Sequence, residues 1–182
     1  MKYYLLIILI LGVSSQTENE RKVWDYLIKE GLSKSGVACL MGYLKAESGI
    51  ESVIYDNSCK SKIGLTDQEY VDQVNNGIYP EILFIYDGVG FGLAQWSYYT
   101  RKQALMNHCR GRIGNMDCQL EYLVAELKMY FTSLYKELKS TNDIKTCTNI
   151  VLYNYEITGY TISEQNIIYN YAQNYYDIFA LE

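Results

Sequence analysis

The chain has 182 residues, of which 49% are hydrophobic, with twenty tyrosines and a single proline. This composition predicts one globular domain with a sizeable core and excludes disordered and fibrous chains. The formal charge is −5 at pH 7 and the sequence contains no basic patch, which argues against nucleic acid as a partner.

The first sixteen residues have the pattern of a secretory signal peptide. Lys2 precedes an apolar run from Tyr3 to Val13, two serines follow, and cleavage is expected near Ser15 or Gln16. The run is too short for a stable membrane anchor, and no later stretch approaches about 20 continuous apolar residues. We therefore expect residues 1–16 to be removed and residues 17–182 to form an exported domain, whose charge falls from −5 to −6 with the loss of Lys2.

Helices are predicted along most of this domain. The first runs from about Asn19 to Glu30, with Gly31 as its stop signal. The second is capped by Ser33 or Ser35 and ends at Gly49.

Further helices follow the same signals. Residues 66–69 form a capping box that opens a short helix. Later helices begin at Asp117, Asp143 and Ser163, and the stripe of the first of them extends to Leu134. The sequence thus predicts a mainly α fold, with a short β segment at Ile82 to Tyr86 as its one candidate strand.

Five cysteines lie in the exported part, where most should be paired, and one must be left over. Cys109 with Cys118 is the pair we expect first, because the residues between them have the composition of a loop joining two helices. The other pairings stay open. No Cys-x-x-Cys occurs and His108 is the only histidine, so we expect no metal and no other cofactor.

Glu47 occupies an unexpected place on the second helix. Val37, Leu40, Met41 and Leu44 recur at helical spacing, and Glu47 is the next position on that apolar face. Burial disfavours the ionised form of a carboxyl group, so we expect a raised pKa and a proton retained near neutral pH, as a general acid requires. The structural alternative is an edge glutamate that turns into water or pairs with a cation such as Lys45.

The second unusual segment is glycine-rich and spans Asp87 to Trp96. Its glycines allow close approach of a ligand to the backbone, and Gln95 and Trp96 add an amide and a broad aromatic face. Sugars bind to such combinations, whereas the features of a nucleotide loop are missing. The structural alternative is a tight turn with Trp96 in the core and Arg101 in a structural role.

Several segments, in this order, resemble the phage-tail lysozyme family of the lysozyme-like superfamily across about residues 21–177. They are residues 24–27, 31–33, 38–49, 90–96 with Arg101, 119–123 with Glu126 and Leu127, and 155–156. Two positions depart from the family pattern: Tyr43 stands where asparagine is usual after the glycine, and Ser97 where threonine is frequent.

The resemblance implies a compact lysozyme-like helical domain with a substrate cleft. It implies cleavage of the β-1,4 bond between N-acetylmuramic acid (MurNAc) and N-acetylglucosamine (GlcNAc) in bacterial peptidoglycan. Glu47 aligns with the catalytic glutamate, and Ser48, Gly92, Gln95 and Trp96 are candidate substrate-binding residues. The chain is short and carries its own leader, which suggests a free-standing secreted enzyme acting as a monomer.

A second carboxylate would decide the route of the reaction. Asp56 and Asp87 are candidates because each lies near one of the two motifs in sequence. Without such a group, polar residues could hold the water, or a muramic-acid hydroxyl could attack internally as in lytic transglycosylases. The sequence leaves these routes open.

Two other functional classes remain open. A cysteine peptidase would need His108 beside a distant cysteine. A non-catalytic cell-wall binding protein would use the same aromatic residues without Glu47. The acidic charge, unlike that of cationic antibacterial proteins, favours an extracellular role in an acidic, digestive or phagocytic compartment.

Overall fold

The structure is a computed structural model that describes residues 17–155 and 159–181. The predicted signal peptide, residues 1–16, lies outside these residues. Among the described helices, none combines the length and the apolarity that a bilayer crossing requires.

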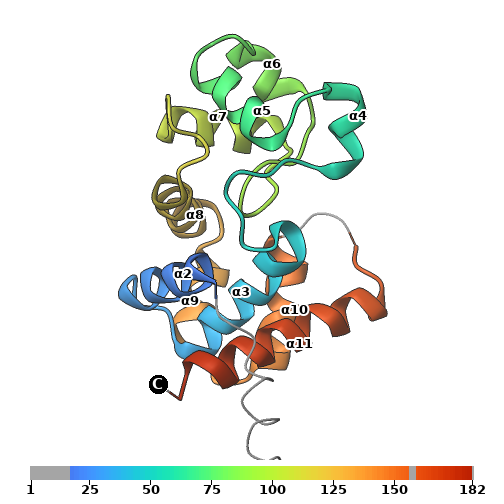
Figure 1. Cartoon of the computed structure of the whole chain (residues 1–182). Helices are drawn as coiled ribbons and strands as arrows, with labels where there is room; N and C mark the ends of the chain where they lie inside the picture. Colours follow the sequence, from blue (N-terminus) through green and yellow to red (C-terminus); the bar gives the residue numbers. More distant parts are fainter. Residues whose placement is uncertain (1–16, 156–158, 182) are drawn as a thin grey trace, which may run out of the picture.

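Helix α3 (Lys34–Ser48) is the central element of one end of the molecule (Figure 1). It is surrounded by four helices, with α11 and α10 making the largest contacts. These four are α2 (Glu18–Lys29), α9 (Thr132–Ser140), α10 (Ile144–Tyr155) and α11 (Ile162–Phe179). Most residues of α3 are buried, so this helix packs against its neighbours on nearly all sides, whereas a surface helix buries one apolar face.

Two glycines allow the neighbours of α3 to pack closely. A Cβ atom at Gly36 would lie 1.9 Å from the Leu138 carbonyl oxygen, and one at Gly42 would lie 2.8 Å from the Ala172 Cβ. Any other residue at either position would force α9 or α11 away from α3. Tyr43, the departure from the family pattern, is buried beside Gly42 and packs against Tyr155, so it belongs to the core.

Shorter elements form the other end of the molecule, and α8 (Met116–Tyr130) lies between the two ends (Figure 1). They are η1 (Asn57–Cys59), α4 (Lys60–Ile63), α5 (Asp67–Asn75), α6 (Glu81–Tyr86) and α7 (Tyr99–His108). An isolated antiparallel bridge joins Tyr55 to Phe91, and the described residues contain no longer strand. The mainly α prediction is therefore confirmed.

The β segment expected at Ile82 to Tyr86 is wrong, because these residues form α6. Pro80 stands at its N-cap with φ −59°, which is favourable for opening a helix, and Glu81 is well placed in the first turn. Phe84 and Ile85 are buried while the other residues of the run are exposed, so burial does not alternate as in a strand.

Helix boundaries follow the capping signals with small differences. Ser33, not Ser35, caps α3, and the Thr66–Glu69 capping box opens α5 as predicted. The last helix begins at Ile162, one residue before the expected Ser163, and it is opened by a capping box formed by Thr161 and Glu164. The stripe that extended to Leu134 is divided between α8 and α9, because the chain bends at Phe131.

The Cys109–Cys118 disulfide is confirmed, and it joins the end of α7 to the start of α8. A second bridge is not formed: Cys39, Cys59 and Cys147 are free. The thiols of Cys39 and Cys147 lie against each other between α3 and α10, both buried. The hydrogen bond to Cys39, together with burial, raises the pKa of the Cys147 thiol, so this group is protected from thiolate chemistry.

This arrangement predicts a stepwise thiol count with a disulfide-exchange reagent. The folded chain should show one fast-reacting thiol, at half-buried Cys59, and two more only after denaturation. A Cys59→Ser variant should lose the fast reaction and keep the two slow thiols. Absence of the two slow thiols from the denatured protein would show that Cys39 and Cys147 are oxidised to a disulfide.

Candidate active site

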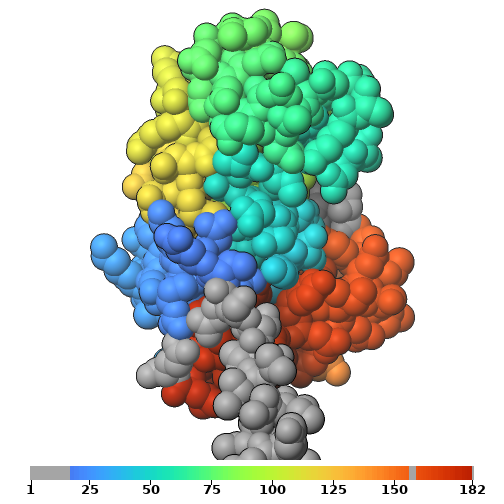
Figure 2. Space-filling view, viewed as in Figure 1, coloured from blue at the N-terminus to red at the C-terminus, as the bar shows by residue number. Residues whose placement is uncertain are grey.

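Glu47 lies in the last turn of α3, where the helix reaches the other end of the molecule. Gly49 ends the helix in the left-handed conformation, with φ 68°, and donates its amide to the Lys45 carbonyl. The Glu47 side chain is half-buried and accepts a hydrogen bond from the Tyr160 hydroxyl, just before α11. Figure 2 shows the surface of the chain around the end of α3 between the segment of α4, above, and α11, below.

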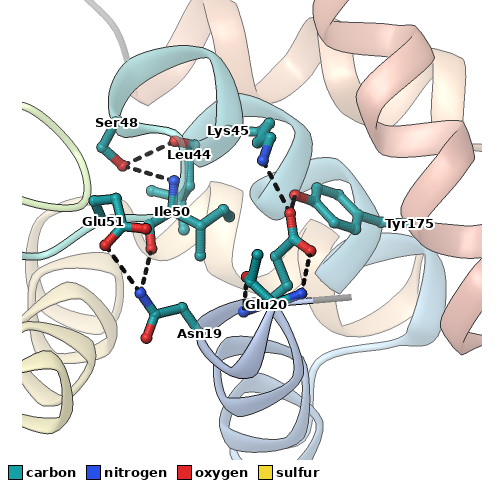
Figure 3. Close-up of polar contacts among 9 residues, drawn as sticks. Asn19, Glu20, Leu44, Lys45, Ser48, Ile50, Glu51 and Tyr175 are labelled. Atoms are coloured by element: carbon teal, nitrogen blue, oxygen red, sulfur yellow. Dashed lines mark hydrogen bonds and ion pairs between the residues drawn. The ribbon is translucent and has the colours of Figure 1, made fainter. Parts of the chain in front are cut away.

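Ser48 fixes the end of α3 against the glycine-rich segment. Its hydroxyl donates to the Leu93 carbonyl at 2.8 Å. The same oxygen lies 3.0 Å from the Leu44 carbonyl and accepts from the Ile50 amide (Figure 3). Ser48 is buried, so its contacts are with backbone groups on both sides of the junction. The structure thus gives Ser48 a positioning task beside Glu47.

Lys45 does not serve as the cation for Glu47. Its ammonium group pairs with Glu20 of α2 at 3.0 Å, and the Tyr175 hydroxyl of α11 donates to the same oxygen at 2.7 Å (Figure 3). Burial alone would raise the pKa of the Glu20 carboxyl, but hydrogen bonds from Tyr175 and the Thr17 backbone, with Lys45, hold it below its usual value. This cluster joins α2, α3 and α11 close to the last turn of α3.

The glycine-rich segment is fixed by hydrogen bonds to Gln119 of α8. The Gln119 amide oxygen accepts from the Leu93 amide at 2.8 Å, and its nitrogen donates to the Ser52 and Ile113 carbonyls at 2.9 and 2.6 Å. Gly92 has φ 70°, and a Cβ there would lie 2.5 Å from the Gln119 oxygen. Glycine is therefore required at this position for the backbone to reach Gln119.

Gln119 is a functional neighbour that residue-by-residue reasoning did not single out. It occurs in the family resemblance, but we predicted no role for it. The available signal was its spacing of one helical turn from Leu123, which places the amide on the apolar face of α8, where it is fully buried. A buried amide of this kind must find partners, and here they are backbone groups of three loops.

Gln95 is the polar side chain of the segment that keeps partial exposure. It adopts φ 46°, and its side-chain nitrogen donates to the Gly92 carbonyl at 3.0 Å. Its amide oxygen lies next to Gly90, where a Cβ would come within 2.9 Å. These contacts give the turn a fixed shape with an amide at its surface.

Trp96 does not offer a ring face to a ligand, contrary to our expectation of sugar contact. The side chain is 0% exposed, packs edge-on against Tyr122, and donates its indole N–H to Glu126 at 3.1 Å. Its position immediately after the motif made it a candidate, but the tight turn at Gln95 directs it into the core.

Glu126 is the centre of a buried polar cluster. Arg101 binds it with two hydrogen bonds, Nε to Oε1 at 2.7 Å and Nη2 to Oε2 at 2.9 Å. The Tyr155 hydroxyl donates to it at 2.5 Å, and the guanidinium lies 4.5 Å from the centre of the Tyr155 ring. Burial opposes ionisation of Glu126, yet Arg101, Tyr155 and Trp96 hold the pKa of its carboxyl below the usual value.

The two candidate second carboxylates have different surroundings. Asp87 accepts hydrogen bonds from the Tyr70 and Tyr79 hydroxyls, from the Val89 amide, and from buried Lys102 at 2.5 Å. These partners occupy both of its oxygens, which gives Asp87 a structural role. Asp56 caps η1 by accepting from the Ser58 amide at 2.8 Å, and its own amide donates to Gly90 of the glycine-rich segment.

Ligand atoms of His108, Cys118 and Glu121 lie within 4.8 Å of one another, which brings three metal-ligating residue types together in the described part of the chain. Cys118, however, is bonded to Cys109, so its sulfur is not available as a thiolate ligand. The cluster therefore gives no support for a metal centre. The same disulfide excludes Cys109 and Cys118, the cysteines beside His108 at the end of α7, as nucleophiles paired with it.

Replacing Glu126 by glutamine is expected to destabilise the fold by on the order of 3 kcal/mol at pH 7, because Arg101 loses its charged partner in a buried site. The stabilisation depends on pH with a definite sign. The folded pKa of Glu126 is lowered, so its contribution is complete above the unfolded value of about 4.3 and is lost as the pH falls through the folded value. Urea unfolding of parent and Glu126→Gln should therefore converge between about pH 5 and pH 2. A difference that stays constant over this range would contradict the ion pair.

The comparisons with known proteins agree with the geometry. A sequence model of the family described as Phage tail lysozyme matches residues 18–179, which is nearly the whole described domain. No curated protein matches the chain. The chain therefore belongs to the phage tail lysozyme family, whose activity is the lysis of peptidoglycan by glycosidic cleavage.

Proposed function

We propose that the protein is a muramidase that cleaves the β-1,4 bond between MurNAc and GlcNAc, with Glu47 as the general acid. One observation carries the proposal: a half-buried carboxyl group stands at the end of a buried helix, hydrogen-bonded to Tyr160 and adjacent to the Ser48 contact with the glycine-rich segment. The two other candidate carboxylates near the motifs have structural roles: Asp56 caps η1, and Asp87 is held by Tyr70 and Lys102.

The proposed reaction begins with proton transfer from Glu47 to the glycosidic oxygen as the C–O bond breaks. The sugar passes through an oxocarbenium-like state, and the leaving GlcNAc hydroxyl carries the proton away. A general acid needs a fixed position within hydrogen-bond reach of the leaving oxygen. Ser48, Gly49 and the Glu20 cluster hold the backbone of this helix end, which supports that requirement.

The second step of the reaction has two candidate routes. In a hydrolase, water adds to the sugar, and Asp56 is the better placed of the two aspartates to assist because Asp87 is held by Lys102. In a lytic transglycosylase, a muramic-acid hydroxyl attacks internally and leaves an anhydro end. We favour hydrolysis, and the identity of the product ends distinguishes the two routes.

Substrate contact is proposed for Gln95, whose half-buried amide lies on the turn formed with Gly92. Gly92 and Ser48 act in this proposal by fixing that turn and its neighbour, while Trp96 supports it from the core. We also propose that the protein is exported by residues 1–16 and acts on bacterial walls outside the cell that makes it.

Replacing Glu47 by glutamine is expected to lower lysis of purified peptidoglycan by at least about a hundredfold, because the amide N–H is too weakly acidic to act as a general acid. Glu51→Gln, a change at an exposed carboxylate four residues away that contacts Asn19, is the matched control and should stay close to the parent. Reducing ends in the parent digest support hydrolysis, and anhydro-muramyl ends support the alternative. Undiminished lysis by Glu47→Gln would remove Glu47 from the mechanism.

Tyr160→Phe is expected to lower kcat about tenfold with little change in KM, since one hydrogen bond to a charged group contributes about 1.5–3 kcal/mol. Tyr160 is a positioning residue in this proposal, so the pH–rate profile gives the decisive measurement. Its hydroxyl favours the ionised carboxylate, and the alkaline limb should therefore move to higher pH in the variant. Lower activity with an unmoved profile would point to a general loss of structure instead.

A further inference from the structure

Three adjoining hollows follow α8 and its neighbours, and we call them together the α8 trough. The first two have volumes of about 420 and 400 Å³ and share Ala104, Tyr122, Glu126 and Tyr130. The third, of about 460 Å³, shares Tyr130 and Phe131 with the first and continues to Asn154 at the end of α10. The trough is therefore an elongated depression and not one compact pocket.

Large aromatic and apolar side chains border the α8 trough in exposed positions. Tyr98 is 53% exposed, Tyr130 69% and Met129 67%. Thr100 and Asn107 add an exposed hydroxyl and an exposed amide to the same lining. Exposed apolar groups gathered along one depression, with polar groups among them, are characteristic of a binding surface.

The floor of the first hollow carries two charges that compensate each other, and His108 in the second hollow lies 3.5 Å from Glu121. Arg101 and Glu126 both line the first hollow, and they are joined by the two short hydrogen bonds of their ion pair. The Tyr122 hydroxyl donates to the Arg101 carbonyl at 2.9 Å and lies 3.2 Å from Glu126, which completes the cluster. A floor of this kind attracts neither phosphates nor cations, and it complements an uncharged ligand.

The lining matches the chemistry of an amino sugar. A pyranose has apolar ring faces that pack on tyrosine rings, and equatorial hydroxyl and N-acetyl groups that exchange hydrogen bonds with hydroxyls and amides. An elongated trough suits several sugar units in a row. A stem peptide of the wall, which carries charged groups, would leave those groups without partners on this floor.

The trough is also connected with the candidate catalytic helix through packed rings. Phe131 in the trough packs against Tyr155, with ring centres 4.9 Å apart, and Tyr155 packs against Tyr43 at 5.5 Å. Tyr43 lies one helical turn before Glu47 on α3. The lining of the trough thus belongs to the same packed unit as the end of α3.

From these observations we propose that the α8 trough binds an uncharged strand of β-1,4-linked N-acetyl amino sugars, away from the bond that is cleaved. The inference rests on the proposed function for the source of its ligand, a wall glycan, but its contacts are distinct from Glu47. Its task would be to hold the polymer while the bond is cut. Cleavage of short fragments that reach only the cleavage site would not depend on binding to the trough.

The test uses the full chain carrying Glu47→Gln, so that binding is measured without cleavage, and insoluble chitin and the GlcNAc hexamer as probes. Tyr98→Ala with Tyr130→Ala should weaken binding of both probes by about tenfold, as loss of two aromatic anchors does at binding sites. The matched control is Tyr153→Ala with Tyr171→Ala, two exposed tyrosines outside the trough. With Glu47 restored, both double variants should cleave a short soluble wall fragment at the parent rate.

Equal binding of both probes by the two double variants would overturn the proposal. So would weaker binding to whole walls with unchanged chitin binding, which would assign the trough to the peptide part of the wall. Sedimentation showing a dimer that only the trough variant loses would assign it to a second copy of the chain. Chitin binding that depends on the trough, in a protein that lyses no wall, would remove the proposed activity and keep the trough.

Discussion

The contact between the end of α3 and the glycine-rich segment is the constraint on which the candidate site depends. Ser48 donates to the Leu93 carbonyl, and Gln119 accepts from the Leu93 amide, so both backbone groups of one residue are fixed from opposite sides. Because Ser48 follows Glu47 directly, the position of the carboxyl group relative to the turn is set by backbone hydrogen bonds. These bonds are buried, where a lost partner costs the full desolvation of the group left behind.

Burial divides the carboxylates of this protein into structural and reactive candidates. Glu126 and Asp87 are buried with cationic partners at 2.7 and 2.5 Å, and each also accepts from tyrosine hydroxyls. An ion pair of this kind holds its charge and its geometry, which suits the joining of helices and is unsuited to proton exchange with a substrate. Glu47 is only half-buried and accepts a hydrogen bond from a neutral tyrosine hydroxyl, so a change in its charge disturbs no buried cation in that contact.

Much of this fold follows from local signals in the sequence. The Thr66–Glu69 capping box, the stop at Gly49 and the Cys109–Cys118 loop each depend on a few neighbouring residues, and each is found as predicted. The segment at Ile82 to Tyr86 was different, because five apolar or aromatic residues in a row carry no period that separates a strand from a short helix. The proline before it was the better guide. Whether a second disulfide forms was also not predictable from the sequence. Its formation requires oxidation as well as two neighbouring thiols, and Cys39 and Cys147 are neighbours but remain free.

The site residues likewise separate into those whose position follows from local spacing and those whose position depends on distant contacts. The position of Glu47 was predictable because helical periodicity determines the direction of a side chain from its spacing alone. Trp96 and Asp87 were candidates only because they adjoin a motif, and adjacency along an irregular segment does not determine direction. The positive φ of Gln95 turns the chain so that the indole enters the core, and Asp87 is drawn to Lys102, fifteen positions further along. Gln119 shows the converse: a residue distant in sequence governs the glycine-rich turn, because only a buried amide could satisfy backbone groups from three loops at once.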